Sequence, residues 1–279
     1  MTEANSNIIL VTWDFTEKAE FALKHAVNSA KALHYEIGLF HIVKKDSEIP
    51  AAEEKLIREI DAKYSDLGCT VKPVVHAGNI FTTITDIAND MGAHMIYMGT
   101  HGIKGMQKLM GSWALKVIAN TKMPFVVVQA PPKNNDLKNI IIPVNFRKEN
   151  KECVNWALYY SRNFGTKFHI LTAKHTDTNF IKGIESNIFF IRKFFNARDI
   201  DYDMIEMPNK TEFFKEVTQY GSENNIDAIM VMTTKDIGFA DYVLGAQEQY
   251  IIANEHEIPV ICINPRPPKI GGSFNTAGG

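Results

Sequence analysis

The residues best suited to chemistry lie in one glycine-rich segment, Gly99-Thr100-His101-Gly102-Ile103-Lys104-Gly105, and in the turn Gly111-Ser112-Trp113 that follows it. The segment comes after an apolar run typical of a buried strand and ends where a helical pattern begins. Glycines let the backbone adopt positive φ and approach a ligand closely. The free N–H groups of Ser112 and Trp113 at the helix start would add a partial positive charge, which favours a phosphate. The pattern therefore predicts an anion-binding loop.

Each polar side chain of this segment also has a simpler interpretation. The Ser112 hydroxyl could donate to a phosphate oxygen or cap the helix, and the two roles are compatible. His101 could contact phosphate or act as an acid or base, but without a positioned carboxylate we interpret it as a loop residue. Lys104 is either a counter-charge for phosphate or a solvated lysine, and the sequence favours neither.

Several better-known kinds of site are excluded. No Lys-Ser/Thr pair follows the last glycine, so the segment is not a Walker loop. A dinucleotide-binding GxGxxG would follow the first strand, where the chain reads Thr12-Trp13-Asp14-Phe15. None of the 9 histidines belongs to an HxH or HxxxH pair, so we expect no structural zinc site. Gly111-Ser112-Trp113 does not fit the nucleophile elbow of a serine hydrolase.

Asp14 ends the first predicted strand, at the edge where a ligand is expected. It could accept a hydrogen bond from a nucleoside or bond to its own turn, and we favour the nucleoside. Trp13 is interpreted as core or pocket wall rather than as a stacking platform. Thr12 and Met98, at the ends of the first and fourth predicted strands, complete the set expected to line the ligand edge.

These residues need a scaffold that brings the first and fourth strands together. In the first half, apolar runs predict strands and residues at helical spacing predict helices between them. The expected strands are 8–13, 36–43, 70–76, 95–98 and 125–128, and the helices begin at the Thr16 cap, near 52, near 80 and after Gly111. Five strands alternating with four helices predict a doubly wound parallel sheet, whose ligands bind beyond the carboxyl ends of the strands.

The chain repeats this pattern in its second half. Three blocks recur in the same order: 8–15 as 139–146, 95–100 as 228–233, and 123–128 as 258–263. Their nearly constant spacing indicates a duplication. We therefore predict one α/β domain over residues 1–132, a second over 133–268 and a disordered tail over 269–279, with the domain boundary in a proline-rich polar stretch.

On these motifs the chain resembles a tandem universal stress protein of the UspA-like family. The nucleotide-binding members carry G-x2-G-x9-G-[ST] and a proline-led final strand, and the matching positions are Gly99, Gly102, Gly111, Ser112 and Pro124. The first turn, Val11 to Thr16, and Gly78 also match. Two positions depart from the family pattern: eight residues separate Gly102 from Gly111, and Thr12 replaces a proline.

The resemblance implies two five-stranded domains of the adenine nucleotide alpha hydrolase-like fold, paired about a pseudo-twofold axis through their last strands. It also implies binding of ATP or a related adenine nucleotide. The adenine would lie near the first strand and the phosphates on the glycine loop, with no metal beyond the Mg²⁺ that accompanies a nucleotide. Further pairing of whole chains into a homodimer is left open.

The second copy departs further from the nucleotide-binding pattern. Met232 stands at the position of Gly99, Lys235 at that of Gly102, and Asn145 at that of Asp14, while Ala246 replaces the serine. A β-carbon at a position that needs positive φ costs about 1–2 kcal/mol. We therefore predict that the second domain is degenerate and serves as a structural partner.

Composition narrows the remaining function classes. The net charge of −2 across 279 residues gives no electrostatic case for nucleic acid or an anionic membrane surface. The 3 cysteines are widely spaced, and the polar start does not fit a secretory signal, so we expect a cytoplasmic protein with reduced thiols. Paired phenylalanines at 189–190 and 194–195 have helical spacing and predict core or an interface between the two copies.

Three functions remain. The leading hypothesis is a non-enzymatic stress-response protein that binds ATP or a related adenine nucleotide in its first domain. The alternatives are an interaction scaffold of the same fold without nucleotide, and a slow ATPase. The ATPase is disfavoured because the sequence shows no positioned general base and no pair of metal-binding carboxylates.

Overall fold

The computed structural model describes residues 7–100, 121, 123–134, 136–208, 212–232, 234–235, 242–243 and 250–264. The strands are β1 (Ile8–Thr12), β2 (Glu36–Val43), β3 (Val71–Ala77), β4 (Met95–Gly99), β5 (Phe125–Val128), β6 (Asn139–Val144), β7 (Lys167–Ala173), β8 (Tyr202–Met207), β9 (Ala228–Met232), β10 (Thr234–Lys235), β11 (Tyr242–Val243) and β12 (Val260–Ile263). The helices are α1 (Glu17–Leu33), α2 (Ile49–Lys63), α3 (Ile80–Asp90), α6 (Cys153–Phe164), α7 (Thr178–Asn196) and α8 (Phe213–Glu223), with short 3-10 turns at Asp46–Glu48 and Lys148–Glu152.

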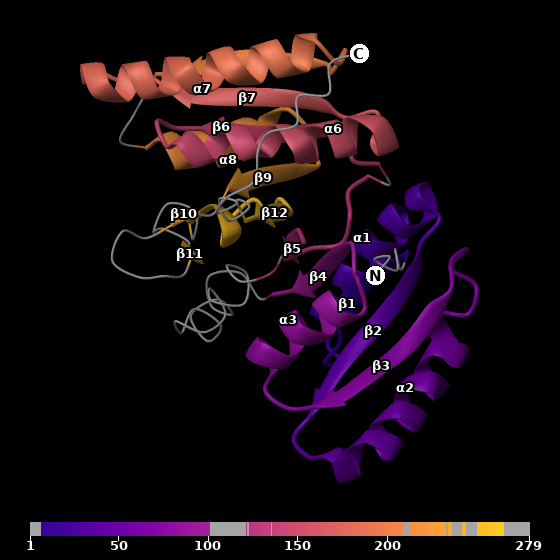
Figure 1. Cartoon of the computed structure of the whole chain (residues 1–279). Coiled ribbons are helices and arrows are strands. Elements are labelled where there is room, and N and C mark those ends of the chain that lie inside the picture. Colours follow the sequence, from indigo (N-terminus) through magenta and orange to yellow (C-terminus); the bar gives the residue numbers. More distant parts are fainter. Residues whose placement is uncertain are drawn as a thin grey trace, which may run out of the picture.

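Ten strands form one continuous sheet in the order β3-β2-β1-β4-β5-β12-β9-β6-β7-β8 (Figure 1). All neighbours are parallel except β5 and β12, which pair antiparallel with Val126 opposite Ile261. Each half thus contributes five strands, and the halves meet through their last strands. The predicted α/β class and the pairing of the two copies are confirmed.

Two apolar cores cover the two faces of this sheet, and each core runs through both halves. One contains the inward sides of α1, α2, α6 and α7, and the other contains those of α3 and α8. The central strands have no solvated face: all five residues of β1 and of β9 are buried. This explains why their sequences are continuous apolar runs rather than alternating ones.

Helix α1 begins where its sequence predicts. The Thr16 hydroxyl caps it by accepting from the Ala19 N–H at 3.4 Å, and Glu17 places a negative charge in the first turn. The helix ends at His34, which adopts φ 57° in the left-handed region. The capping fixes the direction in which the chain leaves the β1 turn.

Reciprocal amide contacts join the halves beside the β5–β12 pair. The buried Gln129 side chain donates from Nε2 to the carbonyls of Ile252 (3.1 Å) and Asn254 (3.3 Å) in the second half. Asn264, which stands at the corresponding position after β12, donates from Nδ2 to the Thr121 carbonyl of the first half at 2.8 Å. Each half therefore satisfies carbonyl groups of the other half.

The paired phenylalanines differ from expectation. Phe195 is fully buried in the core, but the Phe189 side chain is 71% exposed and Phe190 40% exposed. Helix α7 lies at the outer end of the second half, away from the β5–β12 junction (Figure 1). The prediction of a core or interface position is therefore wrong for Phe189. Within the described part of the chain, no helix has the length and apolarity needed to span a bilayer.

Candidate functional site

The turn after β1 is held against β2 by main-chain and side-chain bonds. The Trp13 N–H donates to the Phe40 carbonyl at 2.8 Å, and His41 Nδ1 lies 2.7 Å from the Trp13 carbonyl. Because a carbonyl oxygen only accepts, Nδ1 must carry the proton in this contact. The turn is thus fixed in place before any ligand arrives.

Asp14 lies on the exposed side of this turn. Its Oδ1 accepts from the Thr16 N–H at 3.1 Å and from the Thr16 hydroxyl at 2.6 Å, which is the geometry of an Asx turn. Phe15, between them, adopts φ 63°. Of the two roles considered for Asp14, the bond to its own turn is therefore present and uses Oδ1. The other carboxylate oxygen, Oδ2, has no hydrogen-bond partner in the described chain. A contact of this oxygen with a nucleoside stays a prediction.

A cation and two rings sit beside the turn. Phe15 packs edge-on against the His41 ring with centroids 4.9 Å apart, and Lys55 Nζ lies 3.5 Å from the centroid of the Phe15 ring. His41 comes from β2 and Lys55 from α2, so their approach to Asp14 requires the folded sheet. The sequence carried no signal for either residue.

Gly99 ends β4 next to the first turn of α1. A β-carbon at this position would lie 1.9 Å from the Lys18 carbonyl oxygen and 2.9 Å from the Ala19 nitrogen. The glycine is therefore required for close packing of strand and helix, whatever a ligand demands. Lys18 extends from the same turn, and its Nζ donates to the Gln129 carbonyl at 2.6 Å.

The structure brings part of the expected set together. β1 and β4 are paired neighbours, with Val11 opposite Tyr97, so the turn at Asp14 and the end of β4 share one edge of the sheet. Thr12 and Trp13 are buried, at 7% and 3% exposure, and Met98 is half-buried. The remaining expected residues, His101, Gly102, Gly111, Ser112 and Trp113, lie outside the described residues, as does Lys104.

Trp13 belongs to the core at this edge. Its ring packs edge-on against Tyr64, with centroids 5.6 Å apart, and against Phe15 at 6.3 Å. Its Nε1 is buried without a hydrogen-bond partner in the described chain. The interpretation of Trp13 as core rather than as an exposed stacking platform agrees with this packing.

The corresponding turn of the second half is closed by protein side chains. Asn145 Oδ1 accepts from the Arg147 N–H at 2.9 Å and from Asn150 Nδ2 at 2.7 Å. The buried Asn187 of α7 donates from Nδ2 to the carbonyls of Asn145 and Arg147, both at 2.8 Å. The Asn145 side chain and the two carbonyls of this turn are thus hydrogen-bonded within the second half.

Helix α7 also lies directly on this second turn. A β-carbon at Gly183 would come within 2.9 Å of both the Phe146 carbonyl oxygen and its β-carbon, so the helix backbone touches the turn. The rings of Phe146 and Phe180 stack with centroids 4.3 Å apart. In the second half, α7 therefore occupies the space next to the turn that corresponds to the Asp14 turn.

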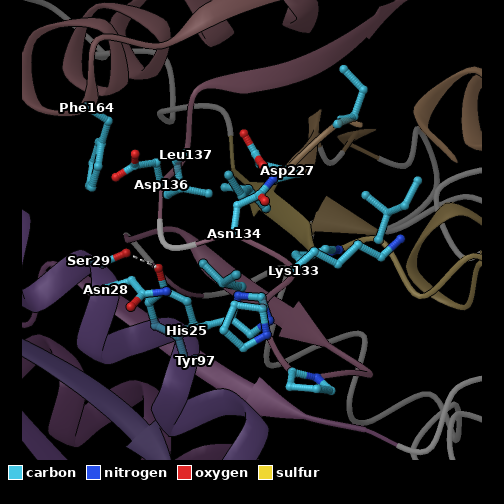
Figure 2. A pocket seen from close by; sticks show the side chains of 18 of the residues that line it. His25, Asn28, Ser29, Tyr97, Lys133, Asn134, Asp136, Leu137, Phe164 and Asp227 are labelled. Atoms are coloured by element: carbon cyan, nitrogen blue, oxygen red, sulfur yellow. Dashed lines mark hydrogen bonds between the residues drawn. The ribbon is translucent and has the colours of Figure 1, made fainter. Parts of the chain in front are cut away.

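A separate crevice of about 50 Å³ lies between the two halves and the segment that links them (Figure 2). Asp227 fastens the link: its Oδ1 accepts from Asn134 Nδ2 at 2.9 Å and its Oδ2 from the Lys138 and Asn139 N–H groups, both at 2.8 Å. Ser29 and Tyr97 share a hydroxyl hydrogen bond of 2.6 Å on the facing wall. The crevice has room for water rather than for a nucleotide.

His25 of α1 lies on this crevice beneath the linker. Burial lowers the pKa of its imidazole to about 4, only partly offset by the hydrogen bond between Nε2 and the Ala130 carbonyl. The ring is therefore neutral near pH 7 and donates from Nε2. Among the described residues, no cluster of histidine, cysteine and carboxylate side chains could hold a metal ion.

Comparison with known proteins extends these observations. The model of the universal stress protein family matches residues 5–129, which span β1 to the end of β5. Universal stress protein MJ0577 of Methanocaldococcus jannaschii is 28% identical, over 43% of this chain and 93% of that protein. Residues 5–129 therefore belong to the universal stress protein family. A second relative from the same organism, universal stress protein MJ0531, is 26% identical over 45% of this chain and 83% of that protein.

Solved structures match this chain along nearly its whole length. A universal stress protein from Archaeoglobus fulgidus superposes with a TM-score of 0.74 at 17% identity, covering 94% of this chain and 99% of that one. A protein of unknown function from Pseudomonas aeruginosa PAO1 gives 0.63 at 16% identity, covering 93% and 92%. These likenesses establish the adenine nucleotide alpha hydrolase-like fold.

Proposed function

We propose that this universal stress protein acts in a stress response by binding ATP or a related adenine nucleotide in its first half, without turnover. The nucleoside would contact the turn at Asp14, and the phosphates would lie on the segment that begins at Gly99. Family membership and the glycine motif support the class of ligand. The residues proposed to line the site are Thr12, Trp13, Asp14, Met98, Gly99, His101, Gly102, Gly111, Ser112 and Trp113, with Mg²⁺ present only as the nucleotide brings it.

The observation that carries this proposal is the difference between the two turns. In the second half, Asn187 and Asn150 occupy the hydrogen-bonding groups of the turn, and α7 covers it. In the first half, Asp14 stays exposed with Oδ2 unbonded in the described chain, and Lys55 adds a positive charge nearby. One chain would therefore hold one nucleotide.

We also propose that the chain consists of two domains, over 1–132 and 133–268. The antiparallel β5–β12 pair and the linker held by Asp227 support a boundary between β5 and β6. In this arrangement the single chain is the equivalent of a dimer. Its first half would bind the nucleotide, and its second half would be a structural partner.

Calorimetric titration with ATP and Mg²⁺ tests the site through a substitution that preserves the turn. Asp14→Asn keeps Oδ1 as an acceptor for Thr16 and removes only the negative charge and one acceptor. If the carboxylate accepts from a nucleoside hydroxyl, affinity should fall about 5–10-fold while the melting temperature is unchanged. Ser112→Ala provides an independent variant on the phosphate side.

Asn145→Asp is the matched control, because it introduces the carboxylate at the equivalent turn of the second half. The stoichiometry should stay at one per chain, since Asn187 and α7 still close that turn. ATP at about 100 times its dissociation constant should stabilise the wild-type chain by about 2.7 kcal/mol. If millimolar ATP gives neither a heat of binding nor a shift in melting temperature, the nucleotide proposal is wrong. The remaining function is then an interaction scaffold that binds no nucleotide.

A further inference from the structure

We propose that copies of this protein associate head to tail, with α7 of one copy packing against α2 of the next. The two helices occupy equivalent places in the two halves, each following the second strand of its half, and lie at opposite ends of the molecule (Figure 1). Their outward surfaces are complementary in charge, and each exposes a large apolar side chain.

The outer surface of α7 is basic and aromatic. Phe189 is 71% exposed, and Arg192 and Lys193 lie three and four residues after it, next to it on the helix surface. Lys182 lies on the same side two turns earlier. None of these three exposed cations forms an ion pair with a described residue. Glu185 is the one carboxylate on the exposed surface of α7 near Phe189.

Two other cations near α7 make cation–π contacts with phenylalanine rings of this helix. Arg198 lies 3.7 Å from the centroid of the Phe194 ring, and Lys151 lies 5.7 Å from that of Phe190. No described cation lies over the Phe189 ring, which is 71% exposed and so is largely available to a partner. A phenylalanine exposed to this degree and surrounded by charge has the composition of an interface anchor.

The outer surface of α2 has the opposite character. Ile57 is 41% exposed, and Glu53 and Asp61 lie four residues before and after it, about 6 Å along the helix on either side. These two carboxylates form no ion pair with a described residue. The cations of α2 are occupied: Arg58 pairs with Glu54 at 3.5 Å and Lys63 with Glu59 at 3.1 Å, while Lys55 lies over Phe15.

The two surfaces therefore match in sign. With Phe189 against Ile57, Lys193 lies four residues from Phe189, which is the spacing of one carboxylate from Ile57. Lys182 lies seven residues away on the other side, beyond Glu185, so its long side chain must extend to reach the second carboxylate. The contact is heterologous, so each added copy leaves a free α2 at one end and a free α7 at the other. One helix pair buries less than the roughly 1,200 Å² of a stable interface, so association should be weak and sensitive to salt.

Sedimentation velocity of the full chain across micromolar to millimolar concentration tests this. The weight-average mass should rise with concentration and fall as salt is raised. Phe189→Ser should weaken association at least about tenfold, and Lys24→Glu, a charge reversal on the exposed side of α1, should leave it unchanged. A wild-type chain that stays monomeric throughout this range would overturn the proposal.

Charge reversal identifies the surfaces. One variant carries Glu53→Lys and Asp61→Lys, and the other carries Lys182→Glu and Lys193→Glu. Each alone should be monomeric, because its α2 and α7 now have the same sign, whereas an equimolar mixture should recover the association since both cross contacts are complementary. All substituted side chains are exposed, so melting temperatures should match the wild type. Association that persists in the single variants, or does not return in the mixture, would rule out the α2–α7 contact.

Discussion

At the scale of single residues, burial decides which groups are charged. The pKa of His25 is lowered to about 4 because the imidazole is desolvated under the linker, whereas an exposed histidine titrates near 6.5. The unfolded chain therefore binds one more proton than the folded chain between these two pH values. Stability from this residue is complete above about pH 6.5 and is lost as the pH falls toward 4.

We predict that the free energy of unfolding falls across this window and that His25→Gln reduces the slope. Glutamine keeps a side-chain N–H for the Ala130 carbonyl but does not titrate. The contribution of His25 is at most about 3 kcal/mol. Burial also lowers the pKa of His94 and His169, so part of the slope should remain. Urea unfolding at several pH values measures it, and an unchanged slope in His25→Gln would show that the residue titrates normally.

Gly99 gives a second prediction at this scale. Gly99→Ala should destabilise the chain by about 3 kcal/mol or more, because the new methyl group meets the rigid Lys18 backbone at 1.9 Å. At Gly165, where φ is +64° but the nearest atom, Lys138 Nζ, lies at an ordinary contact distance of 3.6 Å, alanine should cost only about 1 kcal/mol. Thermal melts of the two variants compare these costs. Equal losses would mean that the first turn of α1 shifts at little cost to accommodate the added methyl group.

Gly99 also shows what residue patterns can and cannot tell. The motif predicted its position correctly, but the spacing alone could not distinguish close approach to a ligand from close approach of a helix. The contributions of His41 and Lys55 could not be predicted, because they depend on which strands and helices become neighbours. Asp14 was placed correctly at the edge, and its Asx turn was one of the two roles that its residue type allows.

At the scale of elements, periodicity was enough to predict the five strands of the first half and the three helices that the structure describes there. Continuous apolar runs predicted β1, β5 and β12 because these strands are buried on both faces, and Thr16 predicted the start of α1 because its hydroxyl caps it. The aromatic pairs of α7 were misleading, since an apolar residue on a helix gives no sign of whether a partner covers it. Phe195 faces the core, and Phe189 faces outward.

Helix α7 closes the second turn through Asn187, and this leads to an element-scale prediction. Asn187→Ala should destabilise the chain by about 1–2 kcal/mol, because the Asn145 carbonyl loses a buried donor, whereas the Arg147 carbonyl keeps Asn150 Nδ2 at 2.9 Å. Asn179→Ala, on the exposed first turn of α7, should change stability by less than about 0.5 kcal/mol. Urea unfolding provides the measurement. A neutral Asn187→Ala would mean that packing of the α7 backbone alone keeps the turn shut.

At the scale of the whole molecule, the two halves share their apolar cores. Both apolar cores continue through the β5–β12 pair, and the fully buried Tyr160 of α6 packs in the same core as α1. Asp227 holds the linker through hydrogen bonds. The side-chain amides of Gln129 and Asn264 each donate to a carbonyl of the other half. These interactions favour a single cooperative transition.

Gln129 tests this cooperativity, because its amide donates to two carbonyls of the other half from a side chain that is 4% exposed. Gln129→Glu replaces the donor with an acceptor and should cost about 3–5 kcal/mol, whereas Gln129→Ala should cost about 2 kcal/mol. In a Trp113→Phe background, chains that keep only Trp13 or only Trp156 report the first and second halves separately. Their unfolding midpoints should coincide in the wild type and separate in Gln129→Glu, as the contact between halves weakens before either core melts. Midpoints that still coincide, at lower denaturant, would mean that the shared cores rather than the amide contacts couple the two halves.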